Sequence, residues 1–174
     1  AIRGSAKVDN HRALATRIDS VITITLGAMA RGGLFDQIGG GFHRYCVDRD
    51  WTVPHFEKML YDNAQLIGTY AEAWARYRDP LYQCICEETI DWLKCEMGTE
   101  NGLFASAIDA DTHHEEGLTY TWKPKEIVEA LGEEGFAFAK HYSVTDQGNF
   151  EGSNVLKLLG NFSDRESHQI HRAR

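Results

Sequence analysis

The sequence lacks the motifs that mark several large classes of protein. It contains no GxSxG and no HExxH motif, and the glycine run at residues 39–41 is not followed by the GK[ST] of a phosphate loop. Its 18 Lys and Arg residues face 26 Asp and Glu residues, which gives a net charge of −8. The basic residues form no cluster, and Arg165, Arg172 and Arg174 belong to a polar tail. We therefore expect neither a nucleotide-binding loop nor a nucleic-acid partner.

Long apolar runs are also missing. The most apolar stretch, residues 21–30, is shorter than the roughly 20 residues that span a bilayer, and it contains Thr23 and Thr25. No basic region followed by an apolar one opens the chain, so we expect no signal peptide, no membrane partner and a cytoplasmic location. The chain begins with Ala1 and not with Met, as an excised fragment would.

Cysteines are few, and none forms a CxxC pair. Cys84 and Cys86 are two residues apart, so on a helix they point to different faces. We predict that these two, with Cys46 and Cys95, are reduced buried thiols; a zinc site or redox pair is the weaker alternative. The sequence predicts no metal and no cofactor.

The sequence does contain regular helical patterns. With 174 residues and 43% hydrophobic residues, the chain is long enough for one domain with a sizeable core. Glycines 32 and 33 end the first pattern, and Asp79 followed by Pro80 gives another helix an N-cap and an N1 residue. The predicted helices cover residues 10–31, 54–78, 80–97, 123–131 and 134–142. Short strands are predicted at 104–108 and 118–122, joined by an acidic loop.

A short internal sequence repeat bears on the fold. Gly32-Gly33-Leu34-Phe35 recurs as Asn101-Gly102-Leu103-Phe104, each time after a helix and before a polar loop. Together with the helix count, this favours helical hairpins arranged around an axis. We predict an all-α fold, a single domain over residues 1–174 that forms part of an α/α toroid (six-hairpin-like) with short β-hairpin loops.

The densest group of reactive side chains follows the glycine run. His43, Arg44 and Tyr45 come first, and residues 51–62 add further groups. On a helix that begins at Pro54, His55, Lys58 and Asp62 would share one face. Aromatic rings beside charged groups are typical of a carbohydrate or polar-metabolite pocket. The alternative is structural, with a histidine that ties down the glycine loop and an acidic residue that favours the helix start. Within residues 51–62, the candidate site residues are Trp51, His55, Glu57, Lys58, Tyr61 and Asp62.

A second candidate site is Asp109 with Asp111. On a strand, residues two apart face the same side, so the two carboxylates could act as acid and base in glycoside cleavage. The alternative is a solvated loop edge. Residues 113–116 (HHEE) are predicted to be an exposed acidic loop and not a metal site.

These segments resemble a known family. Residues 32–45 (GGLFDQIGGGFHRY) and 51–66 (WTVPHFEKMLYDNAQL) are similar to the signature of the YyaL-like, spermatogenesis-associated protein 20 family. The resemblance continues through 104–111 (FASAIDAD), 115–117 (EEG), 120–122 (YTW) and 148–152 (GNFEG). It covers about residues 20 to 158.

The resemblance implies a domain organisation. Full-length members carry an N-terminal thioredoxin-like domain, which this chain lacks together with any CxxC. An α/α toroid similar to N-acylglucosamine 2-epimerases follows it, and this chain would be only its first part. The family's reaction is not settled, so sugar chemistry is implied by analogy of fold alone.

Three hypotheses follow. In a sugar epimerase or isomerase, His43 and His55 would be acid and base, and Arg44 or Lys58 would polarise the sugar oxygens. The carboxylates would orient the histidines or bind hydroxyls; they are those of Glu57, Asp62, Asp109 and Asp111. In a glycosidase-like hydrolase, two of these carboxylates would share a cleft. The third is a non-catalytic module that serves the thioredoxin-like domain.

In each case the ligand is a small sugar-like molecule. A partial toroid leaves apolar helix flanks exposed, so we expect the fragment to self-associate. The residues predicted to contact the ligand are Arg44, Tyr45, Trp51, Lys58, Tyr61, Asp62, Tyr120 and Trp122.

Overall fold

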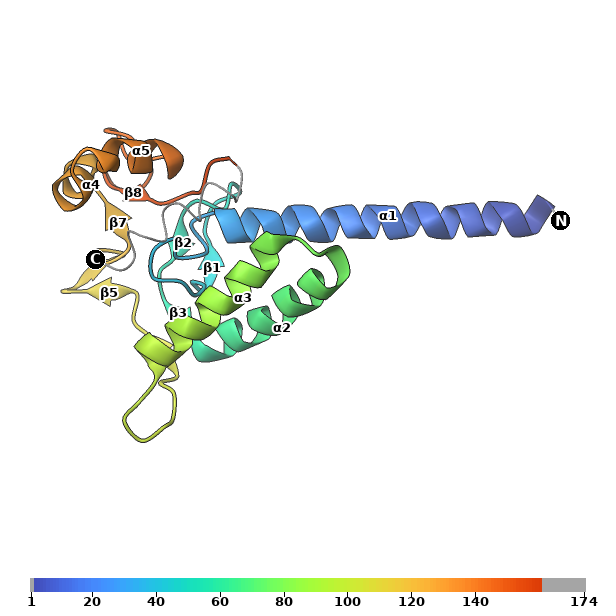
Figure 1. Ribbon diagram of the computed structural model, residues 1–174, viewed down its shortest axis with the longest axis horizontal. Helices are drawn as coiled ribbons and strands as arrows, with labels where there is room; N and C mark the ends of the chain where they lie inside the picture. The colour runs from blue at the N-terminus through green and yellow to red at the C-terminus, as the bar shows by residue number, and fades with distance from the viewer. Residues whose placement is uncertain (1, 161–174) are drawn as a thin grey trace.

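The computed structural model describes residues 2–160, with side chains described from residue 11 onward. The chain is mostly helical within this part, as predicted, and its strands form short antiparallel pairs (Figure 1). The helices are α1 (Ile2–Arg31), α2 (Leu60–Tyr77), α3 (Pro80–Trp92), the π-helix Leu93–Met97, α4 (Pro124–Leu131) and α5 (Glu134–His141). The strand pairs are β1–β2 (Tyr45–Cys46, Pro54–His55), β3–β4 (Lys58–Met59, Ala107–Ile108), β5–β6 (Asp111–Thr112, Glu115–Glu116) and β7–β8 (Thr121–Trp122, Asn154–Val155). The tail arginines 165, 172 and 174 lie outside the described residues.

Several helix ends lie where local chemistry places them. The Asp79 side chain accepts a hydrogen bond from the Leu81 amide at 2.9 Å, and Pro80 occupies the first helical position of α3. Gly132 caps the C-terminus of α4 with a φ of 61°. These predicted boundaries are confirmed.

The predicted start of the second helix at Pro54 is wrong. Pro54 and His55 form β2, which pairs with β1, and Lys58 and Met59 form β3, which pairs with β4. Helix α2 begins only at Leu60. His55, Lys58 and Asp62 therefore do not share a helix face. Pairing with distant segments decided this region, and a local helical pattern cannot report such pairing.

The strands predicted near residues 104–108 and 118–122 are present but shorter. They pair with other segments: Ile108 lies opposite Lys58, and Trp122 lies opposite Asn154. The acidic loop between them folds into the hairpin β5–β6, with His113 and His114 at positive φ in its turn.

The main core lies where the C-terminal end of α1 meets the hairpin α2–α3 and the glycine loop. Phe35, Phe42, Tyr70, Leu81 and Ile85 are almost completely buried there. A second apolar cluster joins α4, α5 and the segment around Leu156, and a third surrounds Phe56. The C-terminal part of α1 and the α4–α5 region therefore belong to different apolar clusters.

The N-terminal part of α1 projects away from the rest of the molecule (Figure 1). Four apolar side chains of this helix, Leu14, Ile18, Val21 and Ile24, are 50–72% exposed. By length and composition alone, the stretch His11–Arg31 could cross a membrane, and 17% of its apolar window is buried. A core helix or a signal sequence passes the same test, so the finding assigns no location.

The two copies of the repeated Leu-Phe sequence differ in burial. Leu34 and Phe35 are 4% and 1% exposed, whereas Leu103 and Phe104 are 68% and 49% exposed. The first pair packs into the core, and the second lies on a projecting loop. The two copies of the repeat thus do not pack in equivalent ways, and the repeat gives no support to the predicted toroid.

The four cysteines are free. Cys84 is buried as predicted, and Cys46 and Cys86 are half-buried. Cys95, by contrast, lies exposed on the π-helix, so the prediction of a buried thiol is wrong for this residue.

Candidate functional site

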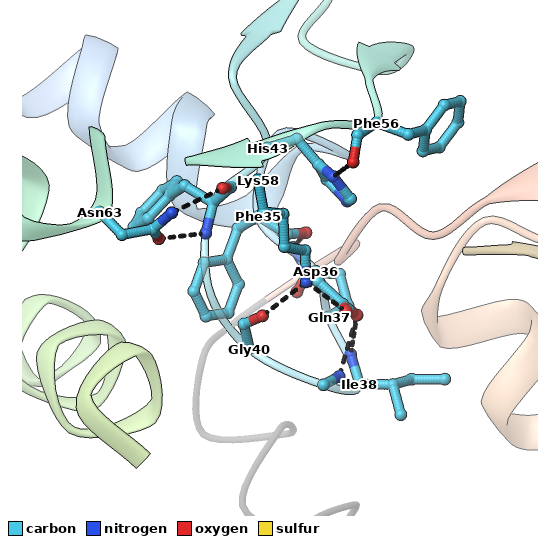
Figure 2. A network of polar contacts seen from close by, with 11 residues as sticks. Phe35, Asp36, Gln37, Ile38, Gly40, His43, Phe56, Lys58 and Asn63 are labelled. Carbon is cyan, nitrogen blue, oxygen red and sulfur yellow. Dashed lines mark hydrogen bonds and ion pairs between the residues drawn. The ribbon is translucent and has the colours of Figure 1, made fainter. Parts of the chain in front are cut away.

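The glycine loop at residues 36–42 is fixed against α2 and α3. The Asn63 side chain accepts a hydrogen bond from the Phe42 amide at 2.7 Å and donates one to the Phe42 carbonyl at 2.9 Å (Figure 2). Gly41 has a φ of +77°, and a Cβ there would lie 2.4 Å from the Trp92 ring. The loop therefore needs glycine both for its conformation and for its close approach to Trp92.

Asp36 and Lys58 form a buried ion pair beneath this loop. Lys58 is 1% exposed, and its Nζ donates to Asp36 Oδ2 at 2.8 Å and to the Gly40 carbonyl at 2.9 Å (Figure 2). The other carboxylate oxygen of Asp36 accepts hydrogen bonds from the amides of Ile38 and Gly39. The ammonium also lies 5.0 Å from the ring centre of Trp92 and 4.7 Å from that of Tyr120. Both charges are thus held by several partners.

Burial and mutual attraction shift the pKa values of both members of the pair. Burial alone would raise the pKa of Asp36, but the charges of Lys58 and His43, with the hydrogen bonds from Lys58 and Gly39, lower it to about 2. Burial lowers the pKa of Lys58, and Asp36 opposes that shift. Asp36 is consequently a stable anion and Lys58 its dedicated counter-ion.

A cleft of about 410 Å³ opens above this pair. Its walls come from the glycine loop, β3, the end of α3 with the π-helix, and the segment from β4 to β7. Its lining includes both charged and aromatic side chains. The charged ones are Asp36, Lys58, Glu96, Asp109 and Asp111, and the aromatic ones are Trp92, Tyr120 and Trp122.

The two segments that the sequence singled out meet in this cleft. Lys58 comes from the first segment and Asp109 and Asp111 from the second, and the pairing of Lys58 with Ile108 brings them together. Of the predicted contact residues, Tyr120 and Trp122 line the cleft as well. One residue of the first segment and two of the second therefore lie in one cleft, and the other candidates of the first segment do not line it.

The carboxylates of the cleft differ in their partners. Asp109 Oδ1 accepts a hydrogen bond from the backbone amide of Asp111 at 3.1 Å. Among the described residues, the side chains of Asp111 and Glu96 have no hydrogen-bond or ion-pair partner. Both are exposed. They are therefore available to a ligand.

His43 lies behind the cleft and not in it. It is 2% exposed, and its Nδ1 is 2.9 Å from the Phe56 carbonyl (Figure 2). Its ring packs edge-on against Tyr120, with 4.6 Å between the ring centres. Burial, helped by the charge of Lys58, lowers the pKa of His43 to about 3. The imidazole is therefore neutral at physiological pH, with Nδ1–H donating to the carbonyl, and supports Tyr120 from behind.

Other predicted residues gather in a separate surface cluster. The His55 ring lies 3.0 Å from Glu116 and 3.6 Å from Glu57, and it stacks on Tyr45 at 5.1 Å. Glu57 also pairs with Arg44 at 2.9 Å. None of these five residues lines the cleft.

Three further predicted site residues lie outside the cleft. Tyr61 is 47% exposed. Asp62 lies partly buried near Arg44 and Glu57, and burial raises its pKa. Trp51 packs against the main core, with its carbonyl accepting a hydrogen bond from Gly33 at 2.7 Å.

Sequence reasoning missed three charged or aromatic residues of the cleft. Asp36 was visible only as the acidic residue that opens the glycine loop. Trp92 has the helical spacing of a core residue of α3, and it is 3% exposed although it lines the cleft. Glu96 carried no signal, because nothing local indicates that a π-helix follows α3.

Comparison with known proteins agrees with the resemblance seen in the motifs. No protein-family model matches the chain. The chain is 38% identical to Spermatogenesis-associated protein 20 of Homo sapiens over 82% of its own length and 22% of the human protein. It is 36% identical to the Mus musculus protein of the same name over 79% of its length and 20% of that protein. An uncharacterised protein of Caenorhabditis elegans is 35% identical over 87% of the chain and 25% of that protein. The chain spans about a fifth to a quarter of the length of these relatives.

Proposed function

The chain belongs to the spermatogenesis-associated protein 20 family, of which it matches one region, and on that premise we propose that its cleft binds a carbohydrate. One observation carries the proposal: a single cleft joins the aromatic rings of Trp92, Tyr120 and Trp122 to the carboxylates of Asp109 and Asp111. Rings of this kind cover the apolar face of a sugar, and carboxylates accept hydrogen bonds from its hydroxyls. The volume of about 410 Å³ is within the range of small-molecule sites.

Within this proposal, glycoside hydrolysis is the chemistry that the side chains favour. It needs two carboxyl groups beside one glycosidic bond, and Asp109 and Asp111 line the same cleft. A histidine-based isomerase would need His43 and His55 on the substrate. His43 is sealed behind Tyr120, and His55 belongs to the surface cluster with Glu57. We therefore assign the acid and base roles to the two aspartates.

We also propose that the chain forms the first part of an α/α toroid. In support, α2 and α3 form a helical hairpin that packs against the end of α1. Apolar side chains on α1 are left uncovered, as at the edge of an incomplete ring of helices. A longer relative has enough additional chain to cover them.

Titration calorimetry of the chain with neutral oligosaccharides tests binding. We expect D109N and D111N each to weaken binding at least about tenfold, a loss of about 1.4 kcal/mol. D91N is the matched control, since Asp91 is exposed and lies outside the cleft. Absence of binding across a broad panel would contradict the proposal.

Hydrolysis of aryl glycosides by the same proteins tests the chemistry. Turnover that D109N or D111N abolishes, and that D91N leaves unchanged, would support the assigned roles. Binding without turnover would instead favour the non-catalytic module, which in full-length relatives would act together with a thioredoxin-like domain.

A further inference from the structure

We propose that Glu96 makes the cleft selective for a ligand that carries a protonated amine, of the amino-sugar class. The inference rests on the proposed carbohydrate binding and specifies which carbohydrate the cleft takes. It is carried by the charges of the cleft, by the rings around them and by the position of Glu96.

The charges of the cleft do not balance. Within the part of the chain that the structure describes, Lys58 is the one Lys or Arg residue that lines it. Its ammonium is already neutralised by Asp36 at 2.8 Å. The carboxylates of Glu96, Asp109 and Asp111 remain, and no Lys or Arg side chain pairs with any of them among the described residues. The cleft therefore has three negative charges for which its own side chains supply no cation.

The aromatic lining suits a cation as well. Trp92 and Tyr120 already flank the buried ammonium of Lys58 at 5.0 and 4.7 Å from their ring centres. The face of an aromatic ring attracts ammonium groups, and Trp122 adds a third ring to the same cleft. A ligand with both a hydrophobic sugar face and an ammonium group can thus use the rings and the carboxylates together.

Glu96 is the free carboxylate that acts on the charged floor of the cleft. It lies in the π-helix Leu93–Met97, four residues after Trp92, and both residues line the cleft. Burial lowers the pKa of Lys58 and raises that of Tyr120 to about 12, and the charge of Glu96 acts upward on both pKa values. Its carboxylate is thus within electrostatic reach of the cleft floor. Single π-helical turns are found frequently at functional sites.

These features predict an order of ligands. A protonated amine gains a charge-assisted hydrogen bond to Glu96. No existing ion pair has to be broken for this, because Glu96 is exposed before binding. A neutral N-acetylated sugar gains only the ring and hydroxyl contacts. A uronate meets three like charges and is repelled.

The test is titration calorimetry of the full 174-residue chain at about pH 6, where carboxylates are ionised and amines protonated. The ligands are a glucosamine oligomer, its N-acetylated counterpart, a glucose oligomer and a uronate oligomer of equal length. We expect the glucosamine oligomer to bind at least about tenfold more tightly than the neutral oligomers, and the uronate oligomer to bind most weakly. E96Q should reduce the preference for the amine several-fold, because it weakens binding of the amine much more than binding of the neutral sugars. E87Q, at an exposed position of α3 outside the cleft, should preserve the preference.

The outcomes separate this inference from the proposed function. Equal affinity for the amine and the neutral sugars, or an E96Q variant that weakens all ligands alike, would overturn the amine selectivity and leave carbohydrate binding in place. Tight binding of the uronate would overturn it as well. Failure of every oligomer to bind would overturn carbohydrate binding itself, and the selectivity with it.

Discussion

Lys58 donates a 2.8 Å hydrogen bond to Asp36 at the floor of the cleft, and this lysine is 1% exposed. The pair joins β3 to the glycine loop, two segments that are 22 residues apart. Removal of either partner would leave the other, largely buried charge without its counter-ion, and this cost is several times the worth of an exposed pair. The ion pair is therefore a structural support of the cleft.

We expect K58M to lower the free energy of unfolding by about 3–5 kcal/mol, because Asp36 would lose its counter-ion. The double variant D36N/K58M should recover part of that loss, since no unpaired charge remains. Urea denaturation followed by circular dichroism measures both. R44Q is the control, since it breaks the exposed pair with Glu57 and should have little effect. A K58M variant as stable as wild type would contradict the structural role.

His43 should make stability depend on pH. Its pKa falls from an ordinary 6.5 to about 3 on folding, so the unfolded chain takes up the proton first as the pH drops. The contribution is complete above pH 6.5 and is lost as the pH falls toward 3, by an amount on the order of 4 kcal/mol.

The variant H43N tests this, since an asparagine amide can still donate to the Phe56 carbonyl and does not titrate over this range. We expect a flatter stability curve between about pH 6.5 and 4.5 than that of wild type. Equal slopes for wild type and H43N would show that His43 is not the titrating group.

Gly41 should not tolerate a side chain. Alanine there would have a φ of +77° and a Cβ only 2.4 Å from the Trp92 ring. We expect G41A to cost about 2–5 kcal/mol from backbone strain and overpacking together. G68A is the matched control, since Gly68 lies within α2 with nothing within 4 Å of an added Cβ, and it should gain up to about 1 kcal/mol. Thermal unfolding of the two variants measures both effects, and a G41A variant that melts with wild type would contradict the predicted clash.

The exposed apolar face of α1 should drive self-association. Val21 and Ile24 are 64% and 72% exposed, and a groove between α1 and α2 adjoins Val21. Sedimentation velocity should show a sedimentation coefficient that rises with protein concentration for wild type. V21K/I24K should remove this dependence, whereas T16K, at an exposed polar position of the same helix, should keep it. A clean wild-type monomer at all concentrations would refute this prediction.

The extent to which the sequence predicted the fold depends on how local each feature is. The N-cap at Asp79 with Pro80, and the Gly132 that ends α4, act through neighbouring residues, and their boundaries were predicted correctly. The motifs around the glycine run and residues 104–111 were likewise enough to assign the family.

Features that depend on contact between distant segments were decided by the tertiary structure. Residues 54–59 read as the start of a helix, but Tyr45 and Ile108 offer strand partners, so these residues are extended. The same pairings divide the predicted site: Lys58 joins Asp109 and Asp111 in the cleft, while His55 is left in the surface cluster. The sequence by itself determined the helix boundaries set by Asp79–Pro80 and by Gly132, and which two segments would carry polar groups. Only the packed chain determined which of those groups share a cleft, because burial and pairing are properties of residues far apart in sequence.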